Sequence, residues 1–165
     1  MVVEVYKLIN GHSLELKEDI TFDSEYFVLT RPLLKINSCK VLAKIHQYDD
    51  FINVHLKVNA NVILECSYSL QAFESNVSGE EELNFSTYES EEDEDFIIYK
   101  GNKIELDEYI FDLVSASVPL SPKAPGATLP KSGKGYRVIS EDSLVEEEAN
   151  KGNSKFDKLL DLDLD

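Results

Sequence analysis

The chain has 165 residues, of which 42% are hydrophobic, and its 32 Asp and Glu residues outnumber 16 Lys and Arg residues to give a formal net charge of -16. This length fits one domain with an appended tail, and the hydrophobic content excludes a wholly disordered chain. Such acidity is typical of a solubilising surface, and it also suits a basic protein partner.

The sequence contains no apolar run that approaches the roughly 18 residues needed to cross a bilayer. Its N-terminal residues contain an early acid and no basic region, so they lack the pattern of a signal peptide. We therefore expect a cytoplasmic protein that does not contact membranes. In that compartment the two cysteines, Cys39 and Cys66, are expected to stay reduced.

The first elements are predicted to be strands. Residues 2–9 favour β-structure and predict an N-terminal strand, and Asn10-Gly11 predicts the turn that follows. Leu14, Leu16 and Ile20 share one parity with polar residues between them, which predicts a second strand.

The most regular pattern is the alternation of apolar and polar residues in 51–66, which predicts a strand with one buried and one exposed face. Residues 38–47 alternate in the same way, and Tyr48-Asp49-Asp50 predicts the turn of a hairpin. Because the second strand is longer than most strands, we expect a bend or bulge near residues 59–61. The apolar positions of this strand are Ile52, Val54, Leu56, Val58, Ala60, Val62, Leu64 and Cys66.

Five basic residues share the predicted exposed side of this hairpin: Lys40, Lys44, His46, His55 and Lys57. Lysine and histidine on an exposed strand face are commonly no more than solvated positions. The other interpretation is a shallow contact surface for phosphates or for an acidic partner. The sequence alone leaves both interpretations open.

Downstream of the hairpin, residues 73–77 and 83–87 predict extended structure on both sides of a turn at Ser78-Gly79. Residues 89–95 form an acidic run without a basic residue. The mutual repulsion of its charges predicts a solvated loop.

Residues 96–99 and 103–106 flank a Lys-Gly-Asn turn and predict another hairpin. Asp107 stands at the N-cap position of a helix over residues 108–117, because Ile110, Leu113, Val114 and Val118 share one helical face. Pro119 ends this helix by disfavouring α-geometry at the preceding residue.

The composition changes abruptly between Pro119 and Arg137, where prolines and glycines accompany basic residues and no acid occurs. A loop of this length is more often functional or disordered than a simple connector. The segment is not a phosphate-binding P-loop, because no Ser or Thr follows Lys134 and no strand precedes it. Its basic residues are Lys123, Lys131, Lys134 and Arg137.

The C-terminal part is acidic. Residues 139–150 predict at best a marginal helix, and Ser154 can cap a final short helix that carries Phe156 and Leu159. Such an amphipathic acidic terminus either packs against the body of the protein or docks in a groove of a partner.

The sequence offers no catalytic constellation. Cys66 shares the parity of the buried residues, so it is not placed to act as a nucleophile with an exposed histidine. Cys39, Cys66 and a histidine lack the clustered spacing of a structural zinc site. Aromatic residues interleaved with basic ones, as on a base-stacking sheet, are not conspicuous. We therefore predict a protein that acts by binding, without enzymatic activity, metal or cofactor.

Two short motifs are informative. The first is Leu64-Glu65-Cys66-Ser67-Tyr68-Ser69-Leu70 with Phe73, and the second is the helix after Asp107 followed by Val118-Pro119-Leu120-Ser121-Pro122. They resemble the Cys-Ser-Arg-Cys-Leu corner and the Leu-Pro-Leu-x-Pro exit of the YceD-like proteins, the bacterial and plastid large ribosomal RNA subunit accumulation proteins. The resemblance marks as family motif Glu65, Cys66, Ser67, Ser69, Leu70, Phe73, Asp107, Pro119 and Pro122.

The chain departs from that family pattern in its cysteines. Ser69 stands where many relatives have a second cysteine, and the segment after Pro122 has none of the cysteines that often follow there. If those cysteines bind zinc in relatives, this chain has lost the site. Without partner cysteines, Cys66 is expected to be no more than a small buried residue.

The sequence thus predicts an α+β fold with a mainly antiparallel sheet, open or approaching a barrel, a main helix near residues 108–117 and a short C-terminal helix. We expect a core domain in residues 1–118, a basic Pro/Gly-rich loop in 119–137 and an acidic segment in 138–165. The expected contact residues are Lys40, Lys44, His55, Lys57, Lys123, Lys131, Lys134 and Arg137.

The resemblance implies a non-catalytic ribosome biogenesis factor that supports the synthesis, processing or stability of 23S ribosomal RNA. Its partner would be large-subunit ribosomal RNA or a precursor, contacted directly or indirectly. The alternative is an acidic adaptor that binds a basic ribosomal protein or another assembly factor.

Overall fold

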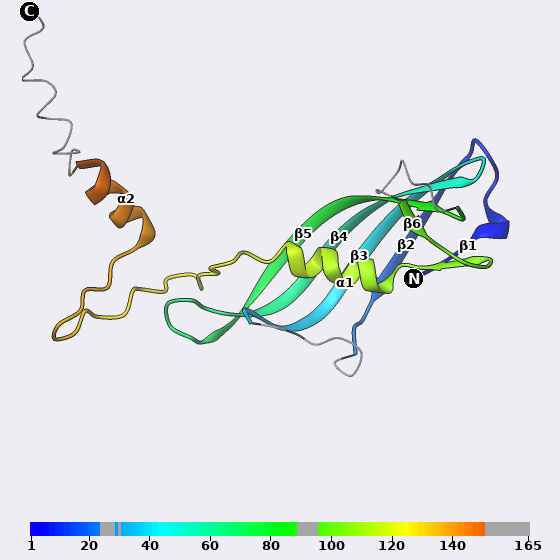
Figure 1. Ribbon diagram of the computed structural model, residues 1–165. Helices are drawn as coiled ribbons and strands as arrows, with labels where there is room; N and C mark the ends of the chain where they lie inside the picture. The colour runs from blue at the N-terminus through cyan, green and yellow to red at the C-terminus, as the bar shows by residue number, and fades with distance from the viewer. Residues whose placement is uncertain (24–28, 30, 89–95, 151–165) are drawn as a thin grey trace, which may run out of the picture. The chain divides into compact units, whose positions relative to one another are not determined.

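The computed structural model describes residues 1–23, 29, 31–88 and 96–150 (Figure 1). The chain divides into two compact units, Met1–Ala124 and Pro125–Asp165. The first unit combines β-sheet with the helix α1 (Asp107–Ala116), and the second contains the helix α2 (Glu141–Asn150). The predicted α+β class is confirmed, whereas the finer boundaries after residues 118 and 137 stay predictions.

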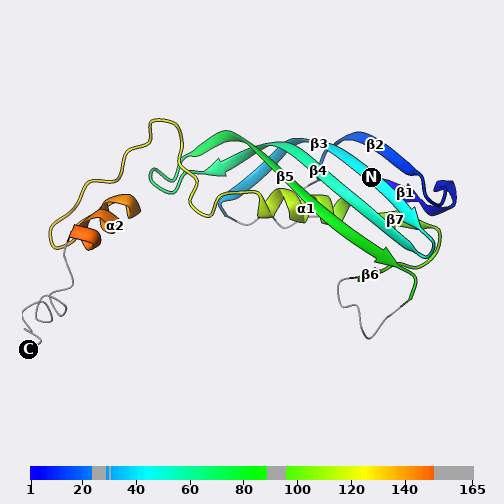
Figure 2. The ribbon, with the colours of Figure 1, turned by 90° about the horizontal axis from the view of Figure 1, so that it is seen from above.

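The main sheet of the first unit is open. Neighbouring strands are antiparallel except for the last two, which are parallel. Within the described chain the first and last strands form the two edges, so the sheet does not close into a barrel (Figure 2). In spatial order the five strands are β2 (Ser13–Ile20), β3 (Leu33–Tyr48), β4 (Phe51–Glu65), β5 (Ala72–Ser86) and β6 (Phe96–Ile98).

The predicted central hairpin is confirmed. β3 and β4 pair from Tyr48 and Phe51 at the turn to Leu33 and Leu64 at the far end. Two register shifts in β3 add residues opposite positions 61–64 of β4. The irregularity therefore lies in β3, close to but not within the segment 59–61 where we expect a bend. The alternation of β4 stays intact along its whole length.

The hairpin predicted around Gly101 is wrong. β6 runs parallel to the end of β5, whereas β7 (Lys103–Glu105) pairs with β1 (Val2–Glu4) in a separate two-stranded sheet. The Gly101 turn thus links two sheets, because each short strand finds its backbone partners in a different neighbour. The N-terminal strand predicted for residues 2–9 ends at Glu4, and the 3-10 helix η1 (Val5–Lys7) follows.

The turn predicted at Ser78-Gly79 is also wrong, because β5 runs through both residues without a break. A Cβ atom at position 79 would clash with the Ser117 hydroxyl and would lie 2.9 Å from the Cδ1 atom of Leu113. Both of these residues belong to the C-terminal end of α1. The glycine therefore permits a close approach of the helix to the sheet and does not change the direction of the strand.

α1 packs on one face of the sheet, over β4 and β5 (Figure 1). Its Ile110, Leu113 and Val114 are buried, as the helical periodicity predicts. The predicted N-cap is wrong: Leu106 occupies that position, and Asp107 is the first helical residue. The carboxylate of Asp107 pairs with the amino group of Met1 instead of capping a backbone N–H.

The core lies between α1 and the alternate residues of β3 and β4 that face it, and we call this side of the sheet the core face. All the predicted apolar positions of β4 from Ile52 to Leu64 are buried, as is Cys66. β1 and β7 contribute Val3 and Ile104 to the same cluster. Cys39 and Cys66 are buried free thiols.

In the second unit α2 occupies the segment in which the sequence predicts at best a marginal helix. The Ser140 hydroxyl accepts a hydrogen bond from the backbone N–H of Ser143 at 3.1 Å, which is an N-cap arrangement. The acidic run 89–95 and the helix predicted from Ser154 lie outside the described residues. No helix of the described chain is both long and apolar enough to cross a membrane.

Candidate nucleic-acid interface on the outer face of the sheet

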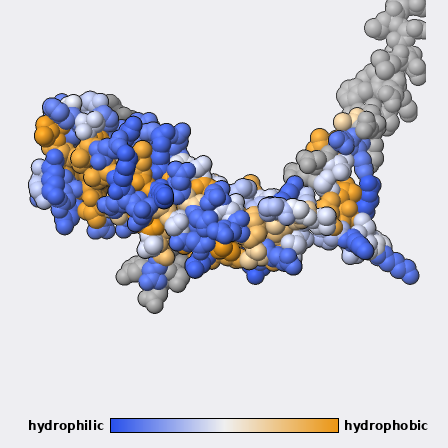
Figure 3. Space-filling model, turned by 180° about the vertical axis from the view of Figure 1, so that it is seen from behind, coloured by the Kyte–Doolittle hydropathy of each residue, from blue (hydrophilic) through white to orange (hydrophobic). Residues whose placement is uncertain are grey.

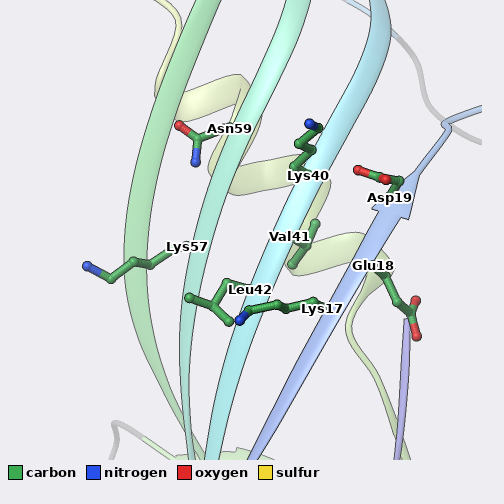
Figure 4. Close-up of a pocket in the computed structure, with 8 residues that line it drawn as sticks. All are labelled: Lys17, Glu18, Asp19, Lys40, Val41, Leu42, Lys57 and Asn59. Carbon is green, nitrogen blue, oxygen red and sulfur yellow. The ribbon is translucent and has the colours of Figure 1, made fainter.

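The side of the sheet opposite α1, here called the outer face, carries the basic residues predicted for the central hairpin. Lys40, Lys44 and Lys57 are exposed on it, and His46 and His55 are half-buried. Figure 4 views this side: α1 passes behind the strands, and lysines extend from β2, β3 and β4. Exposure of this face confirms the predicted two-sided character of the hairpin.

The register of the strands arranges the outer-face charges in rows. Basic side chains occupy the central strands β3 and β4, and most acidic ones occupy β2 and β5 on either side. This cross-strand order brings together residues far apart in the sequence. The rows are Glu15, Lys44, His55 and Glu82; then Lys17, Leu42, Lys57 and Glu80; then Asp19, Lys40, Asn59 and Ser78.

Two of the lysines are already paired. The Lys57 ammonium lies 2.5 Å from the Glu80 carboxylate, and this hydrogen bond lowers the pKa of Glu80. His55 Nε2 lies 3.6 Å from the same carboxylate. Lys17 lies 2.7 Å from Glu15 and lowers its pKa in the same way. Such exposed pairs contribute little to stability, but they occupy both ammonium groups.

Lys40 and Lys44 have no ion pair within 4.0 Å among the described residues. Lys40 borders two shallow depressions of the outer face, and Asn59 lies beside it in both. A concave surface with an unpaired ammonium group is suited to an anionic ligand, and the unpaired Lys44 follows on the same face of β3. Lys40 and Lys44 are therefore the residues of this face best placed to contact phosphate.

Amide side chains extend the polar character of this face along β4 and β5. The Asn61 amide donates to Asn76 Oδ1 at 3.1 Å, and the Asn53 amide donates to Asn84 Oδ1 at 2.8 Å and to Glu82 at 2.7 Å. These mutual hydrogen bonds hold the amides in fixed positions. They leave further donor and acceptor capacity toward solvent, which suits contacts with sugar hydroxyls or phosphate oxygens.

Aromatic residues lie at the hairpin end of the same face, which the sequence analysis missed. The rings of His46 and Tyr48 are stacked, with centroids 6.2 Å apart and an interplanar angle of 14°. Phe51 contacts Phe96 with centroids 4.9 Å apart. Tyr48 is 58% exposed and Phe51 is 45% exposed, so part of each ring is free for stacking. The sequence feature that could have revealed Tyr48 is its parity, because even-numbered residues such as Lys40, Lys44 and Tyr48 face the same side of the strand.

The surface view agrees with a mixed chemistry of this kind. Figure 3 shows hydrophilic residues over most of the part of the molecule at its left, with smaller hydrophobic patches between them. Isolated apolar patches of this size are normal on a soluble surface.

The other predicted basic residues lie outside the strands of the sheet. Lys123 lies over the ring of Tyr68, with its Nζ atom 5.0 Å from the ring centroid. Lys131, Lys134 and Arg137 belong to the second unit. Lys131 and Lys134 are exposed there, whereas Arg137 Nη1 pairs with Glu147 Oε2 at 3.2 Å.

The two halves of the family motif meet at the corner that follows β4. The backbone N–H of Ser67 donates to the Pro122 carbonyl at 2.8 Å, and the N–H of Ala124 donates to Cys66 Sγ at 3.3 Å. Leu70 closes the corner with a φ of 56° and a 2.8 Å hydrogen bond to the Cys66 carbonyl. Pro122 is buried, Pro119 and Ser69 are exposed, and Phe73 is half-buried against the core.

The N–H of Ala124 and the hydroxyl of Ser69 lower the pKa of the Cys66 thiol to about 7. Burial instead raises the pKa of Cys39 to about 11. Cys66 has no accessible surface, so it is a structural corner and not an exposed nucleophile. Within the part of the chain that the structure describes, no three His, Cys, Asp or Glu residues cluster as metal ligands.

One comparison with known proteins gives a match. A family model described as "Large ribosomal RNA subunit accumulation protein YceD" matches residues 54–163, which is most of the chain. The match begins inside β4 and includes the Cys66 corner and α1. No curated protein and no solved structure matches the chain significantly.

Proposed function

Because the chain belongs to the YceD family of large ribosomal RNA subunit accumulation proteins, we propose that it supports the accumulation of 23S ribosomal RNA by binding RNA through the outer face of its sheet. The role is non-catalytic: RNA synthesis, processing or stability depends on the bound protein and not on a reaction that it performs. The observation that carries the proposal is that two unpaired lysines, Lys40 and Lys44, lie on the same face of β3 as the exposed ring of Tyr48, with Phe51 across the turn.

The geometry suits a single-stranded segment. Alternate residues of a strand lie roughly 6.6 Å apart, so Lys40, Lys44 and Tyr48 span an extended path along β3. Ammonium groups attract phosphates without reading sequence, and exposed rings stack on unpaired bases of any kind. The surface therefore favours loops or ends of ribosomal RNA over regular duplex.

The acidic composition limits this binding and does not exclude it. Charges that lie beyond the Debye length of about 8 Å at physiological salt are largely screened, so a local group of lysines can still hold phosphates. Glu15, Asp19 and Glu82 border the lysines closely enough to oppose an RNA backbone placed over β2 or β5. Binding is therefore expected to be weak and confined to β3 and β4. Lys131 and Lys134, in the second unit, are separate candidate phosphate contacts.

A second candidate is the acidic adaptor that binds a basic ribosomal protein or an assembly factor. The observation that favours it is the excess of carboxylates, which gives the chain its net charge of -16. Glu80, Glu81 and Glu82 are consecutive exposed residues of β5. A cationic protein would be attracted to that strand rather than to Lys40 and Lys44.

The proposal is tested by complementation in cells that lack the protein. Lys40→Glu with Lys44→Glu is compared with Lys100→Glu with Lys103→Glu, which makes the same change of charge at exposed residues away from the outer face. We expect the first variant to lower the level of mature 23S ribosomal RNA and the second to restore it fully. Equal restoration by both variants, at equal protein levels, would contradict RNA binding through the outer face.

A further inference from the structure

β5 leaves most of one edge unpaired. It pairs with β4 along its whole length, from Ala72 to Ser86, but β6 covers only Asn84–Ser86 on the other side. The remaining edge, residues 72–83, has no strand beside it among the described residues (Figure 2). A free edge of this length is a template for the addition of another strand.

The hydrogen bonds identify which backbone groups face outward. The backbone N–H of Cys66 donates to the Gln71 carbonyl. In an antiparallel pair the backbone groups of alternate residues point to the same neighbour, so those of the odd-numbered residues of β5 bond to β4. The backbone groups of the even-numbered residues point away from β4. The even residue Ser86 fits this assignment, because its carbonyl accepts from Tyr99 N–H at 3.0 Å on the β6 side. The backbone groups of Glu74, Asn76, Ser78, Glu80 and Glu82 are therefore directed to the open edge.

The side chains of the open edge select the charge of a partner. Glu74, Glu80 and Glu82 are exposed on its outer side, and Glu81 is exposed on the other side. Near the middle of the edge the core side presents Val77 and Gly79, which are buried and half-buried. A strand placed here would meet carboxylates on its outer side and, on the core side, Glu81 and the end of α1 that packs over Gly79.

We propose that the open edge of β5, residues 72–83, binds an extended basic segment of a partner protein by strand addition. The segment carries Lys or Arg at alternate positions, facing Glu74 and Glu82 and competing with Lys57 for Glu80, with small apolar residues between them. The added strand ends before Asn84, where β6 begins to occupy the edge. This surface lies beside the proposed RNA contact and does not depend on it.

The same charges argue against two other occupants. A second copy of the chain pairing edge to edge would bring β5 carboxylates close to those of its partner, which is destabilising. The chain's own C-terminal residues 157–165 carry more acidic than basic residues and would be repelled in the same way. Charge complementarity therefore points to a basic segment of another protein.

The test uses the full-length protein and a synthetic alternating Lys-Val peptide of about ten residues, which spans most of the open edge. The controls are an alternating Glu-Val peptide and the Lys-Val peptide N-methylated at every backbone nitrogen, which keeps the charge but removes the donors. Binding is followed by NMR, with amide hydrogen exchange measured residue by residue. We expect binding of the Lys-Val peptide alone, with new protection of the amides of Asn76, Ser78 and Glu80.

The odd-numbered amides of β5 already bond to β4 and are expected to stay protected throughout. Glu80→Gln with Glu82→Gln should weaken peptide binding by roughly tenfold, whereas Lys40→Glu with Lys44→Glu should not weaken it. Equal binding of the N-methylated peptide, or protection confined to residues outside β5, would overturn strand addition. A concentration-dependent dimer that protects the same amides would show that a second copy occupies the edge and would overturn the choice of partner.

Discussion

The core face and the outer face of the sheet are built from alternate residues of the same strands, yet they depend on different information. On the core face each residue of β4 needs only to be apolar and of suitable size to pack against α1. On the outer face Lys57, His55 and Asn59 acquire their chemistry from residues of β3 and β5 that the register places beside them. Stability is therefore concentrated on one side of these strands and candidate binding on the other.

The largest expected contrast is between two neighbours in β4. Leu56 has no accessible surface and Lys57 is exposed. Leu56→Ala should reduce the free energy of unfolding by about 2–5 kcal/mol, because it deletes buried methyl groups and leaves a cavity. Lys57→Ala should change it by less than about 0.5 kcal/mol. Urea unfolding measures both, and a similar loss in the two variants would remove the distinction between the faces.

A second contrast compares two neighbours in β5. Gly79→Val should reduce the free energy of unfolding by roughly 1–3 kcal/mol, because its side chain must displace Leu113 and Ser117 of α1. Ser78→Val adds the same side chain to the exposed side of the strand and should be nearly neutral. Thermal unfolding monitored by circular dichroism measures both. If Gly79→Val were as stable as the wild type, α1 would not pack closely on the core face at this position.

These two contrasts also show where the sequence was informative and where it was not. The period-two alternation of residues 52–66 predicts the buried side of β4, because burial requires the same residue types wherever the partner lies. Gly79 was interpreted as a turn, since nothing in the local sequence reveals that a helix 34 residues downstream needs the space. The sequence analysis did not place Lys17 on the outer face, and it did not predict the ion pair between Lys57 and Glu80. Both depend on strand register, which local sequence does not reveal.

For the outer face the expected effect of a substitution is on RNA binding and not on stability. Tyr48→Ala with Phe51→Ala should weaken binding of a single-stranded fragment of 23S ribosomal RNA by about 1–3 kcal/mol for each stacked base that is lost. Tyr6→Ala removes a comparably exposed ring away from the sheet's outer face and serves as the control. Fluorescence anisotropy measures both affinities. Equal weakening by the control would place the aromatic contacts elsewhere.

The last contrast distinguishes the two buried cysteines. The folded pKa of Cys66, about 7, lies below its ordinary value of 9.0, so the stability it contributes is fully present above pH 9 and is lost as the pH falls through 7. The difference in free energy of unfolding between the wild type and Cys66→Ser should therefore grow as the pH rises from about 6 to 9. Cys39→Ser, at a site whose pKa is raised to about 11, should show no such growth. Chemical unfolding at several pH values measures both differences.

The most direct test of binding through the outer face is the salt dependence of RNA affinity. For single-stranded RNA the logarithm of the binding constant falls with the logarithm of salt concentration by about 0.7 for each phosphate that the protein neutralises. Lys40→Glu with Lys44→Glu should therefore flatten the slope by at least about 1.4, the contribution of two phosphates, and Lys100→Glu with Lys103→Glu should leave it unchanged. An unchanged slope in the first variant, or the same loss in both, would contradict the account.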